Sequence, residues 1–175
     1  EEWLAQVAVP RGITFENTIC NGVSCIWATA PNADASRTIV HFHSGGYLLG
    51  SANGYKSFGG YLSQATGNRV LLVDYRLAPE NPYPAGVDDG VAVMQGLLDA
   101  GVKPGSIVFC GDSAGGGLVL AALQKMRDLG MPLPACAIAI SPVADFAMSG
   151  PSFTENADRD PLVTADFLAA LGQVY

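Results

Sequence analysis

Residues 111–116 read Gly-Asp-Ser-Ala-Gly-Gly and fit the pattern Gly-x-Ser-x-Gly. An apolar run at 107–110 precedes them, and residues 114–129 have the pattern of a helix. Together they predict a strand, a sharp turn with Ser113 at its tip, and a helix whose positive dipole end lies beside the serine oxygen. Small neighbours suit a serine held at positive φ. Ser113 is the candidate nucleophile, and the alternative is a Gly-rich turn that only joins a strand to a helix.

A second stretch, His43-Ser44-Gly45-Gly46, follows an apolar strand pattern at 38–43. Glycines have no Cβ, so the backbone N–H groups of Gly45 and Gly46 can approach a substrate closely. With the N–H of Ala114 they would form an oxyanion hole, which stabilises the negative oxygen formed in acyl transfer. The alternative is a phosphate-binding or purely structural turn. The Ser113 turn about 70 residues later favours the oxyanion hole.

These two stretches lie within alternating predicted strands and helices. Asn21-Gly22 predicts a tight hairpin turn between strands at 13–16 and 24–28. Further elements are predicted in the order strand 38–43, helix 53–65, strand 70–73, helix 85–100, strand 107–110, helix 114–129 and strand 136–140. This order predicts an α/β fold with a mostly parallel sheet and helices on both faces. Ligands bind at the carboxyl edge of such sheets, where both stretches would meet.

Apolar spacing predicts which side chains are buried. We expect a long loop at 141–162 and then a last helix capped by Thr164. Cys110 and Cys136 lie in apolar strands and are predicted to be buried thiols. A Cys20–Cys25 disulfide across the hairpin is the less favoured alternative to free thiols. The predicted core-facing residues are Val87, Val91, Met94 and Leu98 in helix 85–100, and Phe167, Leu168 and Leu171 in the last helix.

Composition and net charge exclude several classes of protein. The chain has 175 residues, 49% of them hydrophobic, with a mean hydropathy of +0.27, which predicts a folded domain. Its net charge of −7 disfavours binding to nucleic acid or to an anionic membrane. We find no apolar stretch of the roughly 20 residues that a membrane helix needs, and no secretion signal. The cysteines favour free thiols, so a reducing, intracellular compartment is the default and we expect a cytoplasmic protein.

Four segments together resemble one family. Residues 43–51 resemble the HGGG[FY]xxGS loop of the hormone-sensitive-lipase-like α/β-hydrolases, also called bacterial family IV carboxylesterases. Residues 75–85 resemble the YRLAPExPxPA segment of that family, 111–116 its GDSAGG turn, and 141–145 its SPxxD turn. Ser44 stands where that family usually has glycine.

The resemblance implies a carboxylesterase that hydrolyses short acyl esters through an acyl-enzyme on Ser113, without a metal or cofactor. It also implies an oxyanion hole formed by Gly45, Gly46 and Ala114. Tyr47 and Asp112 flank this hole and are candidate substrate-pocket residues, with solvated or packing roles as the equal alternative. The implied partner is a small-molecule ester, with a homodimer possible at full length. The alternative is a non-catalytic, receptor-like protein of the same fold that binds a ligand.

The catalytic acid and histidine of this fold follow the serine in the chain. Both histidines of this sequence, His41 and His43, precede Ser113. We interpret His41 as a core residue and His43 as a brace of the oxyanion loop; His43 as the base is the less favoured alternative. Asp160, in an Asp-Pro-Leu segment, is rejected as the acid because no strand pattern separates it from 136–140.

We therefore expect an incomplete α/β-hydrolase. Residues 1–9 would be the remnant of an N-terminal cap, and 10–175 a partial α/β-hydrolase domain. The last strands, with the acid and the histidine, would be missing. On this interpretation the chain alone is inactive, and its sheet has an open apolar edge. Asp145 and Asp166 are predicted to be a turn residue and a first-turn helix residue.

Overall fold

The computed structural model describes residues 7–160 and 163–175. In these residues a six-stranded sheet has the order β1-β2-β4-β3-β5-β6. Strands β1 and β2 pair antiparallel, as do β2 and β4, whereas β3 pairs parallel with β4 and β5, and β5 with β6. The predicted mostly parallel sheet is thus confirmed. The strands are β1 (Thr14–Cys20), β2 (Val23–Thr29), β3 (Asp34–Phe42), β4 (Asn68–Val73), β5 (Ile107–Asp112) and β6 (Cys136–Ile140).

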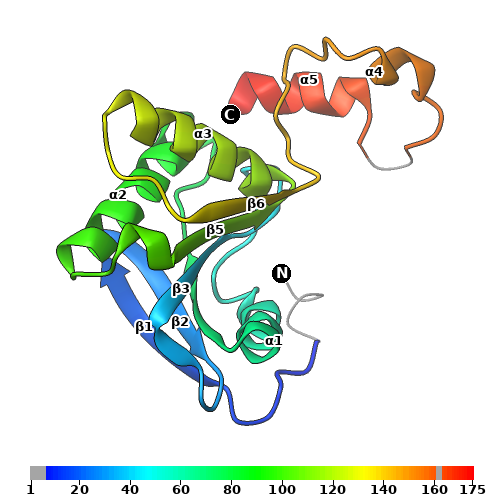
Figure 1. Ribbon diagram of the computed structural model, residues 1–175. Coiled ribbons are helices and arrows are strands. Elements are labelled where there is room, and N and C mark those ends of the chain that lie inside the picture. The colour runs from blue at the N-terminus through cyan, green and yellow to red at the C-terminus, as the bar shows by residue number, and fades with distance from the viewer. Residues whose placement is uncertain (1–6, 161–162) are drawn as a thin grey trace.

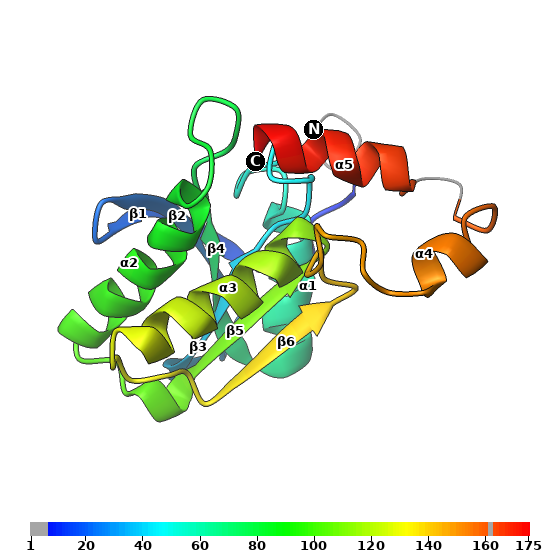
Figure 2. The ribbon, with the colours of Figure 1, turned by 90° about the horizontal axis from the view of Figure 1, so that it is seen from above.

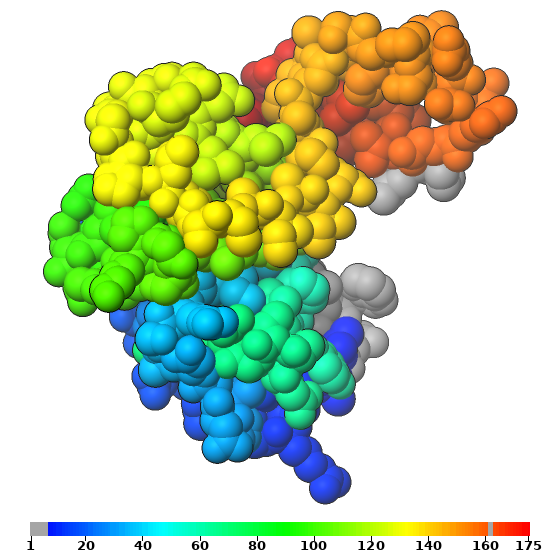
Figure 3. Space-filling view, viewed as in Figure 1, coloured from blue at the N-terminus to red at the C-terminus, as the bar shows by residue number. Residues whose placement is uncertain are grey.

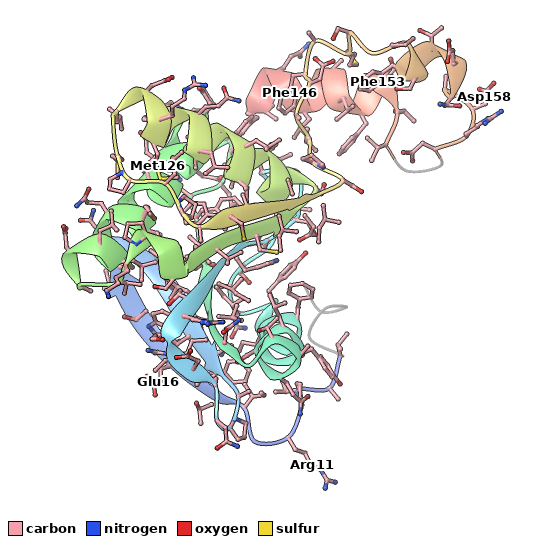
Figure 4. The ribbon with its side chains drawn as sticks, viewed as in Figure 1. Arg11, Glu16, Met126, Phe146, Phe153 and Asp158 are labelled. Carbon is pink, nitrogen blue, oxygen red and sulfur yellow. The ribbon has the colours of Figure 1, made fainter. Side chains whose placement is uncertain are left out.

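Helices cover both faces of the sheet (Figure 1). Helix α1 (Lys56–Thr66) packs on one face, and α2 (Ala85–Asp99) and α3 (Ala114–Asp128) pack on the other. Side chains alternate between the faces of each strand, so β4 contributes to two cores. Leu71 lies in the core under α2 and α3, with Met126 of α3 (Figure 4), and Leu72 lies in the core under α1.

The hairpin turn between β1 and β2 forms as predicted. Asn21 and Gly22 both have positive φ, 46° and 85°, as a two-residue turn of this kind requires. The turn sets a register in which Cys20 pairs with Val23 and Thr18 pairs with Cys25. The two cysteines are therefore not cross-strand partners, and all four cysteines are free thiols.

The buried face of α2 differs from the predicted stripe. Val87 and Met94 are buried, but Val93 and Leu97 replace Val91 and Leu98. The reason is Gly90, which faces inward: a Cβ there would lie 3.4 Å from the Phe42 ring and 3.3 Å from the Ala122 Cβ. The small residue lets α2 lie close to β3 and α3. The helix is therefore rotated about its own axis so that Gly90 faces these two elements.

The same face of α2 buries Asp89. Its carboxylate accepts hydrogen bonds from the backbone N–H of Arg76 (2.7 Å) and from the guanidinium of Arg76 at Nε (2.9 Å) and Nη2 (2.7 Å). The side chain of Asp89 is 6% exposed and that of Arg76 50% exposed. This pair ties the irregular segment 74–84 to the start of α2.

Replacing Asp89 by alanine is expected to lower the free energy of unfolding by about 2 kcal/mol. The change leaves the Arg76 N–H without its acceptor, while the half-exposed guanidinium regains water. Urea denaturation measures the difference. Asp99→Ala, at an exposed position of the same helix, is the control and should change stability by less than about 0.5 kcal/mol. Equal midpoints for the two variants would contradict a stabilising role for the pair.

Strand β6 lies at the edge of the sheet, and its burial was predicted wrongly. Cys136 is exposed, and Ile138 and Ile140 are each 49% exposed, whereas Cys110 on β5 is buried as predicted. Among the described residues only β5 pairs with β6, and no helix covers its α1-side face; Figures 1 and 3 show the strand on the outside. An apolar strand is buried only when neighbouring elements cover it. Strand β6 lacks such cover on one side, so the sheet has the open apolar edge that was expected.

The C-terminal segment crosses the carboxyl ends of the strands. After the short helix α4 (Ser152–Glu155), α5 (Ala165–Val174) lies near the loop 44–50 (Figure 2). Thr164 caps α5 by accepting a hydrogen bond from the Phe167 N–H (3.2 Å), as predicted. Leu168 and Leu171 are buried, whereas Phe167 is 47% exposed and is not part of the buried core. Its ring still lies on the predicted inner side, because a Cβ on Gly46 would be 4.0 Å from the ring tip.

Two sequence expectations fall partly outside the described residues. These are the cap remnant at 1–9, of which 1–6 are not described, and the Asp-Pro-Leu segment, of which 161–162 are not described. The predicted loop 141–162 contains α4. In the described ranges, no helix combines the length and the apolarity needed to cross a membrane.

Candidate active site

Ser113 occupies the turn between β5 and α3. Its φ of 53° and ψ of −118° lie outside the regions that residues other than glycine normally adopt. The surrounding backbone holds this conformation: the Ser113 N–H donates to the Ile140 carbonyl (2.9 Å), and the Ser113 carbonyl accepts from the N–H groups of Gly117 and Val143 (both 3.0 Å). The serine thus lies at the tip of a strained strand–helix turn, as predicted.

The glycines around Ser113 permit very close backbone contacts. A Cβ on Gly115 would lie 2.0 Å from the Phe42 carbonyl oxygen, and one on Gly111 would lie 2.4 Å from the Gly115 carbonyl oxygen. A Cβ on Gly117 would meet the Tyr47 hydroxyl at 2.1 Å. The first turn of α3 therefore presses directly on the end of β3, which brings Ser113 next to the segment that follows β3.

That segment, residues 43–50, is the loop predicted to form the oxyanion hole (the oxyanion loop). Gly45 and Gly46 have φ of 128° and 61°, and the N–H groups of Leu48 and Leu49 both donate to the Gly45 carbonyl. A Cβ on Gly45 would lie 2.1 Å from the Leu49 carbonyl oxygen, so the loop requires glycine there. No described residue accepts a hydrogen bond from the N–H of Gly45 or Gly46. Both amides are available to a ligand.

Tyr47 continues the loop with φ of 61°. Its ring stacks on Tyr175 at 3.8 Å between centroids, and its hydroxyl donates to the Val143 carbonyl (3.2 Å). Burial raises the pKa of this phenol, whose side chain is 3% exposed. In this structure Tyr47 packs the loop against α5, and its predicted role in a substrate pocket stays a prediction.

Asp112, the residue before Ser113, is partly exposed at the end of β5. Its Oδ1 lies 3.6 Å from Nε2 of His41. Burial raises the pKa of the Asp112 carboxyl, but the polar side chains of His41 and Ser44 nearby outweigh this effect, and the pKa lies below its usual range. The carboxylate is therefore ionised at neutral pH.

A pocket of about 450 Å³ opens beside this carboxylate. Most of its wall is apolar or aromatic, with contributions from α1, the end of β6 and the N-terminal segment. Asp112 therefore borders this pocket, and its predicted role in a substrate pocket stays a prediction. The lining residues are Val7, Gly54, Tyr55, Ser57, Phe58, Tyr61, Asp112 and Ile140.

The two histidines lie in the protein interior. His41 is 1% exposed, with its ring against Tyr55 (5.4 Å) and Phe58 (4.7 Å), as expected for a core residue. His43 is also 1% exposed, and its Nδ1 is 2.8 Å from the Ser44 carbonyl oxygen. Burial lowers the pKa of His43, although its hydrogen bond with Ser44 opposes the shift. Among the described residues, neither ring is hydrogen-bonded to Ser113.

Two tyrosines that the sequence did not single out hold the oxyanion loop. The Tyr75 hydroxyl donates to the His43 carbonyl (2.8 Å), and the Tyr75 ring stacks on the His43 ring at 4.2 Å. The Tyr55 hydroxyl contacts both the backbone N–H and the side chain of Ser44. Tyr75 is the first residue of the family-like segment 75–85, and this position indicated that it could matter for the site. Tyr55 belongs to no motif, so nothing in the sequence indicated its contact with Ser44.

Three further carboxylates that the sequence analysis named lie in turns or at the start of a helix. Asp145 accepts hydrogen bonds from the N–H groups of Ala147 (3.0 Å) and Ser149 (2.8 Å), and Asp166 lies in the first turn of α5, both as predicted. Asp160 accepts from the Val163 N–H (2.9 Å) in the projecting segment, where Figure 4 labels Phe153 and Asp158. Within the described parts of the chain, no group of His, Cys, Asp or Glu side chains has the arrangement of a metal site.

Comparison with known proteins agrees with this fold. Residues 39–175 match a family model described as alpha/beta hydrolase fold. The chain belongs to the α/β-hydrolase fold family. Within it, the chain is a hormone-sensitive-lipase-like member: an esterase structure from the bacterial hormone-sensitive lipase family superposes with a TM-score of 0.94 at 41% identity, covering 99% of this chain and 59% of the other.

Two curated relatives point to the same class of protein. An acetyl-hydrolase of Streptomyces hygroscopicus is 43% identical over 175 residues, which are 100% of this chain and 57% of the relative. Carboxylesterase NlhH of Mycobacterium tuberculosis is 37% identical over 136 residues, which are 75% of this chain and 42% of the relative. The chain thus spans about half the length of the curated relatives that it matches.

Proposed function

We propose that the whole protein is a serine carboxylesterase that hydrolyses small, short-chain acyl esters. The observation that carries this proposal is Ser113 in a strained strand–helix turn beside the two unpartnered amides of the oxyanion loop. The Ser113 Oγ attacks the ester carbonyl, and the N–H groups of Gly45, Gly46 and Ala114 stabilise the oxyanion. The alcohol leaves, and water then hydrolyses the acyl-enzyme. The names of the relatives, acetyl-hydrolase and carboxylesterase, support this reaction class.

Ser113 must give its proton to a base. We propose that this base lies outside these 175 residues. In this fold the acid and the histidine follow the serine, whereas His41 and His43 precede it and are held in the interior. The relatives are long enough to carry both groups beyond the matched region. On this proposal the 175-residue chain alone does not turn over esters. The homodimer and the cytoplasmic location stay predictions.

The proposal is tested by treating the whole, folded protein with a fluorophosphonate and locating the adduct by peptide mass spectrometry. We expect a single adduct on Ser113, because an activated serine in an oxyanion hole reacts with such reagents and an ordinary serine does not. Ser141, which also has positive φ, is an internal control and should stay unmodified. A folded sample without an adduct on Ser113 would contradict the proposal. If that sample still bound a small ligand, the receptor-like alternative would be favoured.

A further inference from the structure

The Tyr47 hydroxyl reaches from the oxyanion loop to the segment that follows β6. It donates a hydrogen bond to the Val143 carbonyl (3.2 Å), and Tyr47 is 3% exposed. Gly117, at the end of the first turn of α3, lies against this bond: a Cβ there would be 2.1 Å from the Tyr47 hydroxyl and 2.4 Å from the Val143 carbonyl oxygen. Glycine at this position therefore leaves the room that the bond needs.

Val143 is itself hydrogen-bonded to Ser113. Its N–H donates to the Ser113 carbonyl (3.0 Å), while the Ser113 N–H donates to the Ile140 carbonyl (2.9 Å). The segment 140–143 thus holds the nucleophile turn at both the N–H and the carbonyl of Ser113. Because Val143 uses its carbonyl toward Tyr47 and its N–H toward Ser113, two hydrogen bonds connect the Tyr47 hydroxyl to the backbone of Ser113.

The rest of Tyr47 is fixed to the oxyanion loop and its neighbours. The residue directly follows Gly46, and its carbonyl accepts a hydrogen bond from the Ala78 N–H (2.9 Å). Its ring stacks on Tyr175 with 3.8 Å between the ring centroids. Backbone and ring are both held, so the contact that the hydroxyl makes is transmitted to the adjacent Gly46.

We propose that Tyr47 is a positioning residue, whose hydrogen bond to Val143 sets the position of the oxyanion loop relative to Ser113. The proposed oxyanion hole takes N–H groups from two segments, the loop and the turn at Ser113, and these groups must converge on one oxygen atom. The bond to Val143 connects those two segments. Tyr47 acts through the loop and not on the ester. The catalytic part of this inference rests on the proposed esterase function.

The first experiment compares Tyr47→Phe with Tyr83→Phe in the whole protein, with p-nitrophenyl acetate and p-nitrophenyl butyrate as substrates. Each variant removes one hydroxyl group from a ring that contacts Tyr175, but Tyr83 is 61% exposed and its hydroxyl is hydrogen-bonded to no described residue. We expect Tyr47→Phe to lower kcat about fivefold for both esters with little change in KM, because the oxyanion forms only in the transition state. Tyr83→Phe should leave kcat unchanged.

Two kinetic outcomes would overturn the proposal. Equal kcat values for the two variants of an active parent would show that the hydroxyl of Tyr47 does not position the loop. A change mainly in KM, or a loss that differs between the acetate and the butyrate, would instead mean that Tyr47 contacts the acyl chain.

A second measurement does not depend on activity. Hydrogen exchange of the peptide covering residues 43–50 should be about fivefold faster in Tyr47→Phe than in Tyr83→Phe, because the loop loses its bond to Val143. Equal exchange in the two variants would contradict a role of this bond in holding the loop. If the parent protein lacked esterase activity, the proposed function would fail, and faster exchange would still support the structural role of the bond.

Discussion

Replacing Ser113 by alanine is expected to lower kcat for a short-chain ester by a factor on the order of 10⁴–10⁶ in the whole protein, with KM nearly unchanged. The change removes only the attacking oxygen, and the amides that would bind the oxyanion stay in place. Steady-state hydrolysis of p-nitrophenyl acetate measures the effect. A loss below about tenfold would show that another group is the nucleophile. A change mainly in KM would favour a binding role for Ser113.

A second substitution at Ser113 separates the chemistry from the strain. Alanine keeps the unfavourable backbone conformation of φ 53° and ψ −118°, whereas glycine adopts it at little cost. Ser113→Gly is therefore expected to be as inactive as Ser113→Ala but more stable by about 1–2 kcal/mol in urea denaturation. Equal stabilities would mean that the turn stores no strain at this position.

The outline of the fold and the site could be predicted because each depends on local pattern. The tight two-residue hairpin turn requires positive φ at both central residues, and Asn21 and Gly22 adopt it more readily than other residues do. Thr164 before an apolar helix has the side-chain oxygen of an N-cap. Gly45 and Ser113 belong to short motifs whose backbone conformation determines their composition. Such features need no knowledge of distant segments.

Features that depend on the position of distant segments could not be predicted. Strand β6 has the sequence of a buried strand, but its exposure is decided by which segments cover it. The rotation of α2 depends on the fit of Gly90 against Phe42, about 50 residues earlier in the chain. Likewise, the contact between Tyr55 and Ser44 depends on how α1 packs on the sheet. Sequence spacing carries no information about any of these distances.

Gly115, in the first turn of α3, has almost no space for a side chain. A Cβ there would lie 2.0 Å from the carbonyl oxygen of Phe42 and 2.7 Å from that of His43. Both atoms belong to the backbone at the end of β3, which is hydrogen-bonded to β4 and β5 and cannot move as a side chain can. Any added carbon therefore pushes α3 away from the sheet.

Gly115→Ala is expected to lower the free energy of unfolding by at least about 3 kcal/mol. Helix propensity alone would predict the opposite sign, because alanine is favoured over glycine by up to about 1 kcal/mol within a helix. Gly105→Ala is the matched control, since a Cβ there meets nothing within 4 Å and its φ is not positive. Urea denaturation of both variants measures the difference. If Gly115→Ala were as stable as Gly105→Ala, the close contact between α3 and β3 that positions Ser113 beside the oxyanion loop would be wrong.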